Sequence, residues 1–275
     1  MREETQHDQL TRVLIVAGSD SGGAAGIQAD IKAVTALGGF AMTAVTAITA
    51  QNTLGVQGVW AMSPDAVEAQ LRSVTSDLGA DVIKTGLLVN SAMIERVAEV
   101  LSDAAADVPR VVDPVMVATS GDRLLDTGAV DVYVSVLFPG AALVTPNAIE
   151  AEILTGKAVE DLDGQRRAAE ALLEQGTKGA LVKGGHVEGD TLHDVLQTEY
   201  GEWIFESQRI ETTSTHGTGC TTASASATGI GQSYPIEQAV ERARDYVYGA
   251  IKHAPGFGQG HGPLNHAWQI RDQES

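Results

Sequence analysis

The chain has 275 residues, of which 43% are hydrophobic and 20% charged, as is typical of a folded globular protein. Its 36 acidic and 18 basic residues give a net charge of −18, which disfavours binding to the phosphates of nucleic acids. The single cysteine excludes an intrachain disulfide and a cysteine-rich zinc site.

The acidic surface leaves two interpretations open. The first is an ordinary solvated surface that has no further role. The second starts from the scarcity of lysine, because an acidic, lysine-poor surface suits a salt-rich cytoplasm in which ions screen its self-repulsion. The opening residues 1–10 lack the apolar core of a signal peptide, and no apolar run has membrane-spanning length. We therefore expect a cytoplasmic protein with no membrane partner and no nucleic-acid partner.

Short apolar runs alternate with amphipathic stretches, which predicts repeated β–α units and a mainly parallel sheet. In chain order, the expected strands are Val13–Ala17, Thr43–Thr49, Val82–Lys84, Arg110–Asp113, Ala142–Thr145 and Ala180–Lys183. The expected helices are Gly26–Leu37, Pro64–Asp77, Ser91–Ala105, Ala148–Leu154, Leu162–Gln175, Gly219–Ile230 and Ile236–His253. Between the last strand and the last two helices, Leu192–Thr198 and Trp203–Ile210 are typical of an antiparallel pair.

No linker or internal repeat divides this series. We expect a polar extension over residues 1–12, one domain over 13–268 and a polar tail over 269–275. In such sheets, sites form where strands end and helices begin, so these junctions carry the candidate residues. The chain has neither a P-loop motif nor the glycine fingerprint of a dinucleotide fold, so a nucleotide would need another anion cradle.

The segment THGTGC, Thr215–Cys220, is the strongest candidate for such a cradle. Its two glycines permit a close backbone approach, and the amides at the start of the following helix favour an anion such as a transferring phosphoryl group. The same position predicts a lowered pKa for Cys220 and a reactive thiolate. Taken alone, the segment is equally consistent with a tight turn that holds a buried cysteine.

Other strand ends also carry polar side chains. Asn147 and Glu150 follow an apolar strand, where they either cap a helix or hold a hydrated magnesium ion. Lys183 ends the run ALVK and is placed either to meet phosphate oxygens or to remain solvated. Asp113, before Pro114, serves a metal or water in one interpretation and caps a turn in the other.

Asp30 and Gln51 lie just beyond the first two strand regions, where each is placed to form paired hydrogen bonds with a heterocycle. Each signal is weak in isolation. The histidines at positions 186, 216, 261 and 266 have no metal-ligand spacing, and we interpret them as turn or surface residues.

Seven motifs in one order resemble those of the hydroxymethylpyrimidine and phosphomethylpyrimidine kinases of thiamine biosynthesis: AGSDSGGAAGIQAD, TAVTAITAQNT, VVDPVM, TPNAIEAEILTG, ALVKGGH, THGTGC and GHGPLNH. The resemblance runs from about Val13 to Trp268. It implies an α/β, ribokinase-like fold, with a mainly parallel central sheet and helices on both faces. It also implies ATP-dependent phosphorylation of 4-amino-5-hydroxymethyl-2-methylpyrimidine and then of its monophosphate, with ATP and Mg²⁺ as cofactors, in a homodimer.

The same resemblance implies a role for each candidate residue. The pyrimidine would be contacted by Asp30, Gln51, Leu87 and Val115, of which Leu87 stands where the family often has methionine. The phosphates would be held by Lys183, Thr215 and the backbone amides of Gly217, Thr218 and Gly219. Mg²⁺ and its waters would be organised by Asp113, Asn147 and Glu150. Cys220 stands where the wider ribokinase-like group commonly has an aspartate base, and it would take the proton from the substrate hydroxyl.

Two other functions compete with this interpretation. A pyridoxal or pyridoxine kinase would have the same fold, and turnover of the two alcohols would separate it from a pyrimidine kinase. A catalytically silent pyrimidine-binding or regulatory protein would lack catalytic groups, whereas Cys220, Lys183, Asn147 and Glu150 are all present.

Overall fold

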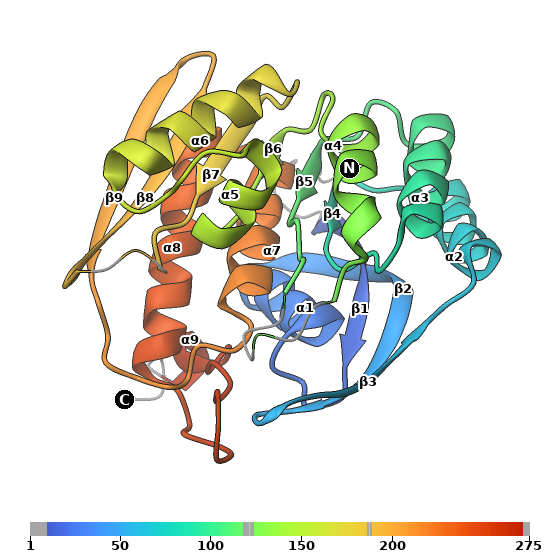
Figure 1. Cartoon of the computed structure of the whole chain (residues 1–275). Helices are drawn as coiled ribbons and strands as arrows, with labels where there is room; N and C mark the ends of the chain where they lie inside the picture. The colour runs from blue at the N-terminus through green and yellow to red at the C-terminus, as the bar shows by residue number, and fades with distance from the viewer. Residues whose placement is uncertain (1–9, 118–120, 122–123, 186, 188, 272–275) are drawn as a thin grey trace, which may run out of the picture.

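The computed structural model describes residues 10–117, 121, 124–185, 187 and 189–271. Figure 1 shows a central sheet with helices packed on both sides. The strands are β1 (Thr11–Asp20), β2 (Gly39–Asn52), β3 (Gly55–Ala61), β4 (Val82–Thr85), β5 (Arg110–Val112), β6 (Leu143–Val144), β7 (Gly179–Val182), β8 (Thr191–Thr198) and β9 (Gly201–Gln208). The helices are α1 (Gly26–Ala36), α2 (Pro64–Asp77), α3 (Ser91–Ala104), the 3₁₀ turn η1 (Thr127–Ala129), α4 (Val130–Leu137), α5 (Ala148–Thr155), α6 (Leu162–Glu174), α7 (Thr218–Gly231), α8 (Ile236–Lys252) and α9 (Trp268–Arg271).

The described strands form one sheet in the order β3-β2-β1-β4-β5-β6-β7-β8-β9. From β2 to β7 every neighbouring pair is parallel, whereas β3, β8 and β9 add antiparallel edges. The predicted mainly parallel sheet is therefore confirmed. The antiparallel pair expected around residues 199–201 is also confirmed, as the hairpin of β8 and β9.

Strand β1 lies inside the sheet because both of its faces are covered. Its residues Val13, Leu14, Ile15 and Val16 are fully buried. They alternate between the two faces, so that Leu14 and Val16 join one apolar cluster while Val13 and Ile15 join another. An unbroken apolar run is what a parallel strand with helices on both sides requires.

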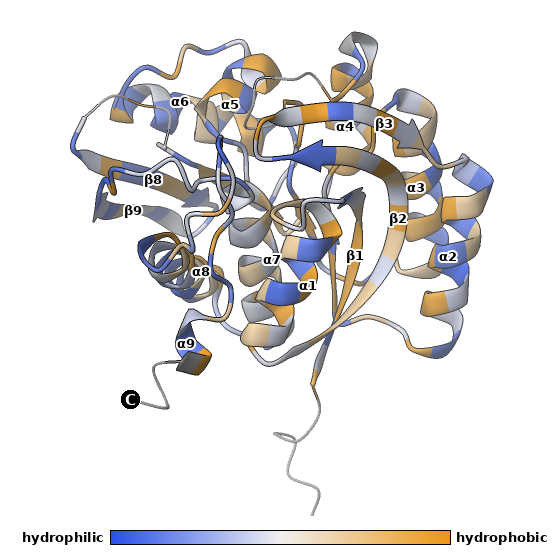
Figure 2. Cartoon of the chain, turned by 90° about the horizontal axis from the view of Figure 1, so that it is seen from below, coloured by the Kyte–Doolittle hydropathy of each residue, from blue (hydrophilic) through white to orange (hydrophobic). Residues whose placement is uncertain are grey.

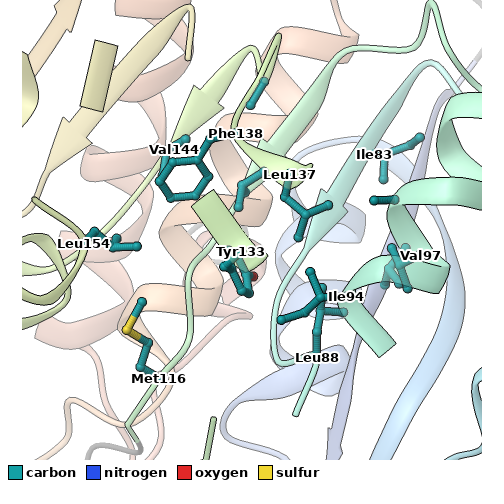
Figure 3. Packing of buried hydrophobic residues seen from close by; sticks show 14 of the residues in the cluster. Ile83, Leu88, Ile94, Val97, Met116, Tyr133, Leu137, Phe138, Val144 and Leu154 are labelled. Carbon is teal, nitrogen blue, oxygen red and sulfur yellow. The ribbon is translucent and has the colours of Figure 1, made fainter. Parts of the chain in front are cut away.

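Helices α2 to α6 cover one face of the sheet, and α1, α7 and α8 cover the other. Figure 3 shows the first core, in which Tyr133 of α4 packs beside Leu137 and Phe138. The Tyr133 and Phe138 rings meet edge to face with their centroids 6.1 Å apart. The two helical layers leave the carboxyl ends of the parallel strands free to form a site.

Helix α4 and strand β3 are among the elements that escaped sequence prediction. Helix α4 has the sequence VDVYVSVL, whose β-branched residues favour a strand, yet Tyr133 and Leu137 are buried at a spacing of one helical turn. Strand β3 pairs with β2 to form a flap at the sheet edge, visible in Figure 2, and most of its residues are exposed. Packing against α3 and α5 stabilises α4, and pairing with β2 stabilises β3.

The ordered elements extend slightly past the predicted domain limits of 13 and 268, because β1 begins at Thr11 and α9 ends at Arg271. None of the helices in the described part of the chain has the length and apolar character that crossing a bilayer requires.

Candidate active site

A cavity of about 600 Å³ lies where the parallel strands end and α7 begins. Every predicted site residue except Asp30 lines it: Gln51, Leu87, Asp113, Val115, Asn147, Glu150, Lys183, Thr215, Gly217, Thr218, Gly219 and Cys220. These residues come from segments far apart in the sequence. The sheet brings them together because parallel strands present their carboxyl ends at one edge.

The first turn of α7 forms one wall of the cavity. Gly217 has φ of +87°, and a Cβ there would lie 1.8 Å from the carbonyl oxygen of Ala24, so only glycine fits this approach to the loop after β1. The Thr218 amide donates to the Thr215 carbonyl at 3.3 Å, whereas the Gly219 and Cys220 amides have no acceptor among the described residues. The turn therefore presents unpaired donors to the cavity, as an anion cradle requires.

Lys183 completes this cradle from the opposite side. It follows β7 directly, and a Cβ on Gly219 would lie 3.4 Å from its ammonium nitrogen. The same nitrogen is 3.7 Å from Oδ1 of Asp113, at the end of β5. A cation, helix-terminal amides and a carboxylate thus meet at one point of the cavity.

Asn147 and Glu150 form a capping box at the start of α5. The Glu150 amide donates to Asn147 Oδ1 at 3.0 Å, and the Asn147 amide donates to Glu150 Oε2 at 2.9 Å. The capping interpretation is therefore confirmed. Burial raises the pKa of Glu150 to about 7, although nearby Lys183 opposes this shift.

The structure places Asp30 differently from its predicted position. Its carboxylate is fully buried behind the cavity wall, where both oxygens lie 3.0 Å from Lys84 Nζ and the Ser224 hydroxyl donates to Oδ1 at 2.7 Å. Asp30 does not line the cavity, because Lys84 and Ser224 surround its carboxylate, and its contact with the pyrimidine stays a prediction. Asp30 is joined to the cavity by its contact with Lys84, which lines it.

Lys84 is a site residue that sequence reasoning missed. It is fully buried on β4, borders the cavity and lies 3.6 Å from Oδ2 of Asp113. Burial disfavours its charge, but Asp30 and neighbouring acidic groups hold its pKa above the ordinary value. The signal in the sequence was a single lysine inside the otherwise apolar strand VIKT.

The predicted lowering of the Cys220 pKa is wrong. Burial of the sulfur raises the pKa of the Cys220 thiol well above its ordinary value, and the nearby Lys84 ammonium offsets this only in part. The Asp113 and Asp30 carboxylates act in the same direction as burial. Together these effects favour the neutral thiol of Cys220.

Gln51 of β2, Leu87 after β4 and Val115 after β5 also line the cavity. Two further residues line it that were not predicted as site residues, Asp20 and His216. His216 is 7% exposed and therefore not the surface residue that its sequence context suggested. Of the other histidines, His266 is buried, His261 is exposed and His186 lies outside the described residues.

The cavity continues past Lys183 to the hairpin of β8 and β9 and to α8. This arm is lined by Leu192, Asp194, Ser207, Arg209, Ile210, Val247, Tyr248 and Ile251, none of which was predicted as a site residue. Arg244 of α8 binds Asp194 across the arm, with 2.7 Å between Nε and Oδ2. We call the part of the cavity lined by Gln51, Leu87 and Val115 the small end, and the part lined by the hairpin and α8 the long arm; the sheet order places β2 and the hairpin on opposite sides of β7, which Lys183 follows.

Comparison with known proteins places this site in context. Residues 20–265 match the family described as phosphomethylpyrimidine kinase. The hydroxymethylpyrimidine/phosphomethylpyrimidine kinase of Streptomyces coelicolor is 47% identical over 258 residues, which are 94% of this chain and 95% of the relative. A crystal structure of phosphomethylpyrimidine kinase from Clostridium difficile 630 is 35% identical, with a TM-score of 0.78 over 88% of this chain and 99% of its own. Pyridoxal kinase from Staphylococcus aureus, in complex with AMP-PCP and pyridoxal, is 31% identical, with a TM-score of 0.88 over 96% of each chain.

Proposed function

The chain belongs to the phosphomethylpyrimidine kinase family, and from that premise we propose how the residues of its cavity carry the reaction. The protein is a kinase of thiamine biosynthesis. It transfers a phosphoryl group from ATP to 4-amino-5-hydroxymethyl-2-methylpyrimidine and then to the resulting monophosphate. Pyridoxal kinase shares the fold at lower sequence identity.

The observation that carries the proposal is the meeting of Lys183 with the first turn of α7. The ammonium lies beside Gly219, whose amide has no acceptor among the described residues. In our proposal the γ-phosphoryl group moves across this point, with the Gly219 and Cys220 amides and Lys183 stabilising its charge. Thr215 and Thr218 shape the turn, and Gly217 allows its close approach to the loop after β1.

The residues around Asp113 fit a magnesium ion that arrives with ATP. Asp113 Oδ2 is buried without a hydrogen-bond partner among the described residues, and the Glu150 carboxylate, which accepts from the Asn147 and Met116 amides, lines the cavity near it. The described residues contain no group of three side chains that would hold a metal alone. Magnesium usually takes one or two carboxylates together with substrate phosphates, so Asp113 and Glu150 suffice and Asn147 fixes Glu150. When bound, the ion would neutralise charge on the ATP phosphates.

The long arm of the cavity suits the nucleoside of ATP. Val247 and Ile251 of α8 and Ile210 after β9 provide apolar surface for a flat base, and Asp194 and Arg209 provide polar groups. With the base in this arm, the triphosphate would extend toward Lys183. The small end, with Gln51, Leu87 and Val115, would then hold the pyrimidine.

Cys220 has a defined place in this scheme. It lies at the cradle between the two ends of the cavity, so its sulfur is placed to take a proton from the substrate hydroxyl. Because burial favours the neutral thiol, the sulfur must lose its proton before it can act as the base. The charge of Lys84 favours that loss.

The choice between pyrimidine and pyridoxine is tested by steady-state turnover of both alcohols with ATP and Mg²⁺. The proposal predicts a kcat/KM for 4-amino-5-hydroxymethyl-2-methylpyrimidine that exceeds the value for pyridoxine by at least about tenfold, since each unmatched buried polar group costs roughly 1–3 kcal/mol. Equal values, or a preference for pyridoxine, would contradict the assignment of the small end.

A homodimer forms part of the proposal. Ile48, Leu54 and Trp60 on the flap of β2 and β3 are 51%, 68% and 60% exposed, and β3 is an edge strand. Contact with a second copy would cover these apolar side chains. Light scattering is expected to give twice the mass of the chain, and Trp60→Glu is expected to shift it toward the monomer. A monomeric wild-type protein would contradict this part.

A further inference from the structure

Asp20, His216 and Gln51 form a chain of polar contacts at the small end of the cavity. Asp20 ends β1, Gln51 lies near the end of β2 and His216 immediately precedes Gly217. His216 Nε2 is 3.3 Å from Asp20 Oδ2 and 2.9 Å from the Gln51 side-chain nitrogen. On its other side, Gln51 Oε1 is 3.2 Å from the hydroxyl of Thr49.

Asp20 is a fixed acceptor in this chain. Its Oδ1 accepts from the Gly22 amide at 2.7 Å, and its Oδ2 accepts from the amides of Ala24 and Ala25 at 2.9 and 2.8 Å. Burial opposes its charge, but His216 and these amides together hold the pKa of Asp20 below its ordinary value. The carboxylate is therefore ionised and offers only lone pairs to His216.

When the Gln51 amide nitrogen faces His216, these polar contacts have too few donor protons. Donation by that amide requires a lone pair on His216 Nε2, which would then also face the Asp20 lone pairs. The Thr49 hydroxyl, with a single proton, would have to donate both to the Ser19 carbonyl at 3.0 Å and to Gln51. Two contacts would thus lack a proton.

Exchanging the amide oxygen and nitrogen of Gln51 resolves both conflicts. His216 Nε2 then carries a proton that it shares between Asp20 and the Gln51 oxygen. The Gln51 nitrogen donates to Thr49, which keeps its single proton for Ser19. The oxygen and nitrogen of a side-chain amide are nearly isosteric, so the hydrogen-bond network decides their order.

We propose that His216, held by Asp20, is a positioning residue that fixes the amide order of Gln51 and thereby selects the heterocycle. This inference rests on the proposed function, in which Gln51 faces the pyrimidine. A 4-aminopyrimidine presents an amine donor beside a ring-nitrogen acceptor, which matches an amide oxygen beside an amide N–H. The phenolic hydroxyl of pyridoxine is not adjacent to its ring nitrogen, so the same amide cannot pair with both.

The test is a double-mutant cycle of His216→Phe and Gln51→Ala, with kcat and KM measured for the pyrimidine alcohol, pyridoxine and ATP. His216→Phe is expected to lower kcat/KM for the pyrimidine alcohol roughly tenfold, mainly through KM, and to leave the KM for ATP within about twofold. In the Gln51→Ala background the same change is expected to have no further effect, because His216 acts on the substrate only through Gln51. His216→Gln, which keeps a donor near the Nε2 position, is expected to restore most of the loss.

Additive losses in the cycle, or equal damage from His216→Gln and His216→Phe, would overturn the proposal in favour of a structural role for His216. A long-range ¹H–¹⁵N spectrum of the wild-type protein tests it without any folding risk from His216→Phe, with the His216 signals identified by their loss in His216→Gln. The expected result is a protonated His216 Nε2, and an unprotonated Nε2 would overturn the proposal. Wild-type protein that does not phosphorylate the pyrimidine contradicts the proposed function. The nitrogen spectrum still decides whether His216 Nε2 donates to Gln51.

Discussion

Cys220→Ala is expected to slow phosphorylation of the pyrimidine alcohol by about 10²–10⁴-fold, the usual contribution of a general base. The monophosphate is expected to lose much less, because its phosphate oxygens are already ionised above a second pKa of about 6 and need no base. Rates of the two steps, each measured from its own purified acceptor, separate these effects. A loss confined to the alcohol is the signature of the proposed role.

The pH dependence provides an independent readout of Cys220. Because burial raises the pKa of the thiol, only a small fraction is thiolate near neutral pH, and this fraction grows tenfold per pH unit below the pKa. In the wild-type enzyme, kcat/KM for the alcohol is therefore expected to rise with pH above neutrality, and this rise should vanish in Cys220→Ala. Cys220→Asp, which supplies a carboxylate base, is expected to recover part of the first step. Equal losses in both steps would remove Cys220 from the base role.

Lys84→Met is expected to destabilise the protein by about 3–5 kcal/mol, because it leaves the carboxylate of Asp30 buried without its cation and removes one of the two cations near Asp113. Urea unfolding measures the loss. The double variant with Asp30→Leu is expected to recover part of it, since removing both members of a buried pair costs less than breaking the pair.

The matched control for Lys84 is a surface ion pair, Arg12 with Asp81, whose side chains are 45% and 33% exposed. Arg12→Met is expected to cost about 1 kcal/mol or less, because water and salt screen exposed pairs. Similar losses for Arg12→Met and Lys84→Met would show that the buried pair contributes no more than a surface one. That result would contradict the expected contribution of Lys84 to stability.

The fold was predictable from the sequence wherever local pattern and final environment agree. The run Val13–Ala17 is typical of a buried strand and lies inside the sheet, and the glycine-rich turn at Thr215 begins a helix as predicted. Helix α4 was not predictable in this way, because the strand propensity of VDVYVSVL yields to packing against α3 and α5. Strand β3 was missed because its residues are mostly exposed and carry no clear alternation of buried positions.

The site was predictable where a residue and its role share one segment. The capping box of Asn147 and Glu150 is a three-residue pattern, and the structure contains it. The pairing of Lys84 with Asp30 joins residues 54 positions apart, so no local pattern could place Asp30 behind the cavity wall. The pKa of Cys220 was mispredicted for the same reason, because burial and two carboxylates distant in the sequence raise it.

A single reaction mixture tests the proposed kinase activity. It contains the wild-type protein, ATP, Mg²⁺ and 4-amino-5-hydroxymethyl-2-methylpyrimidine, and chromatography separates all nucleotides and pyrimidines. We expect release of ADP, with the monophosphate appearing first and the diphosphate following it. Lys183→Met, which removes the cation beside the α7 cradle, is expected to slow both steps. Unchanged pyrimidine, or ADP release without a phosphorylated pyrimidine, would contradict the proposed kinase activity.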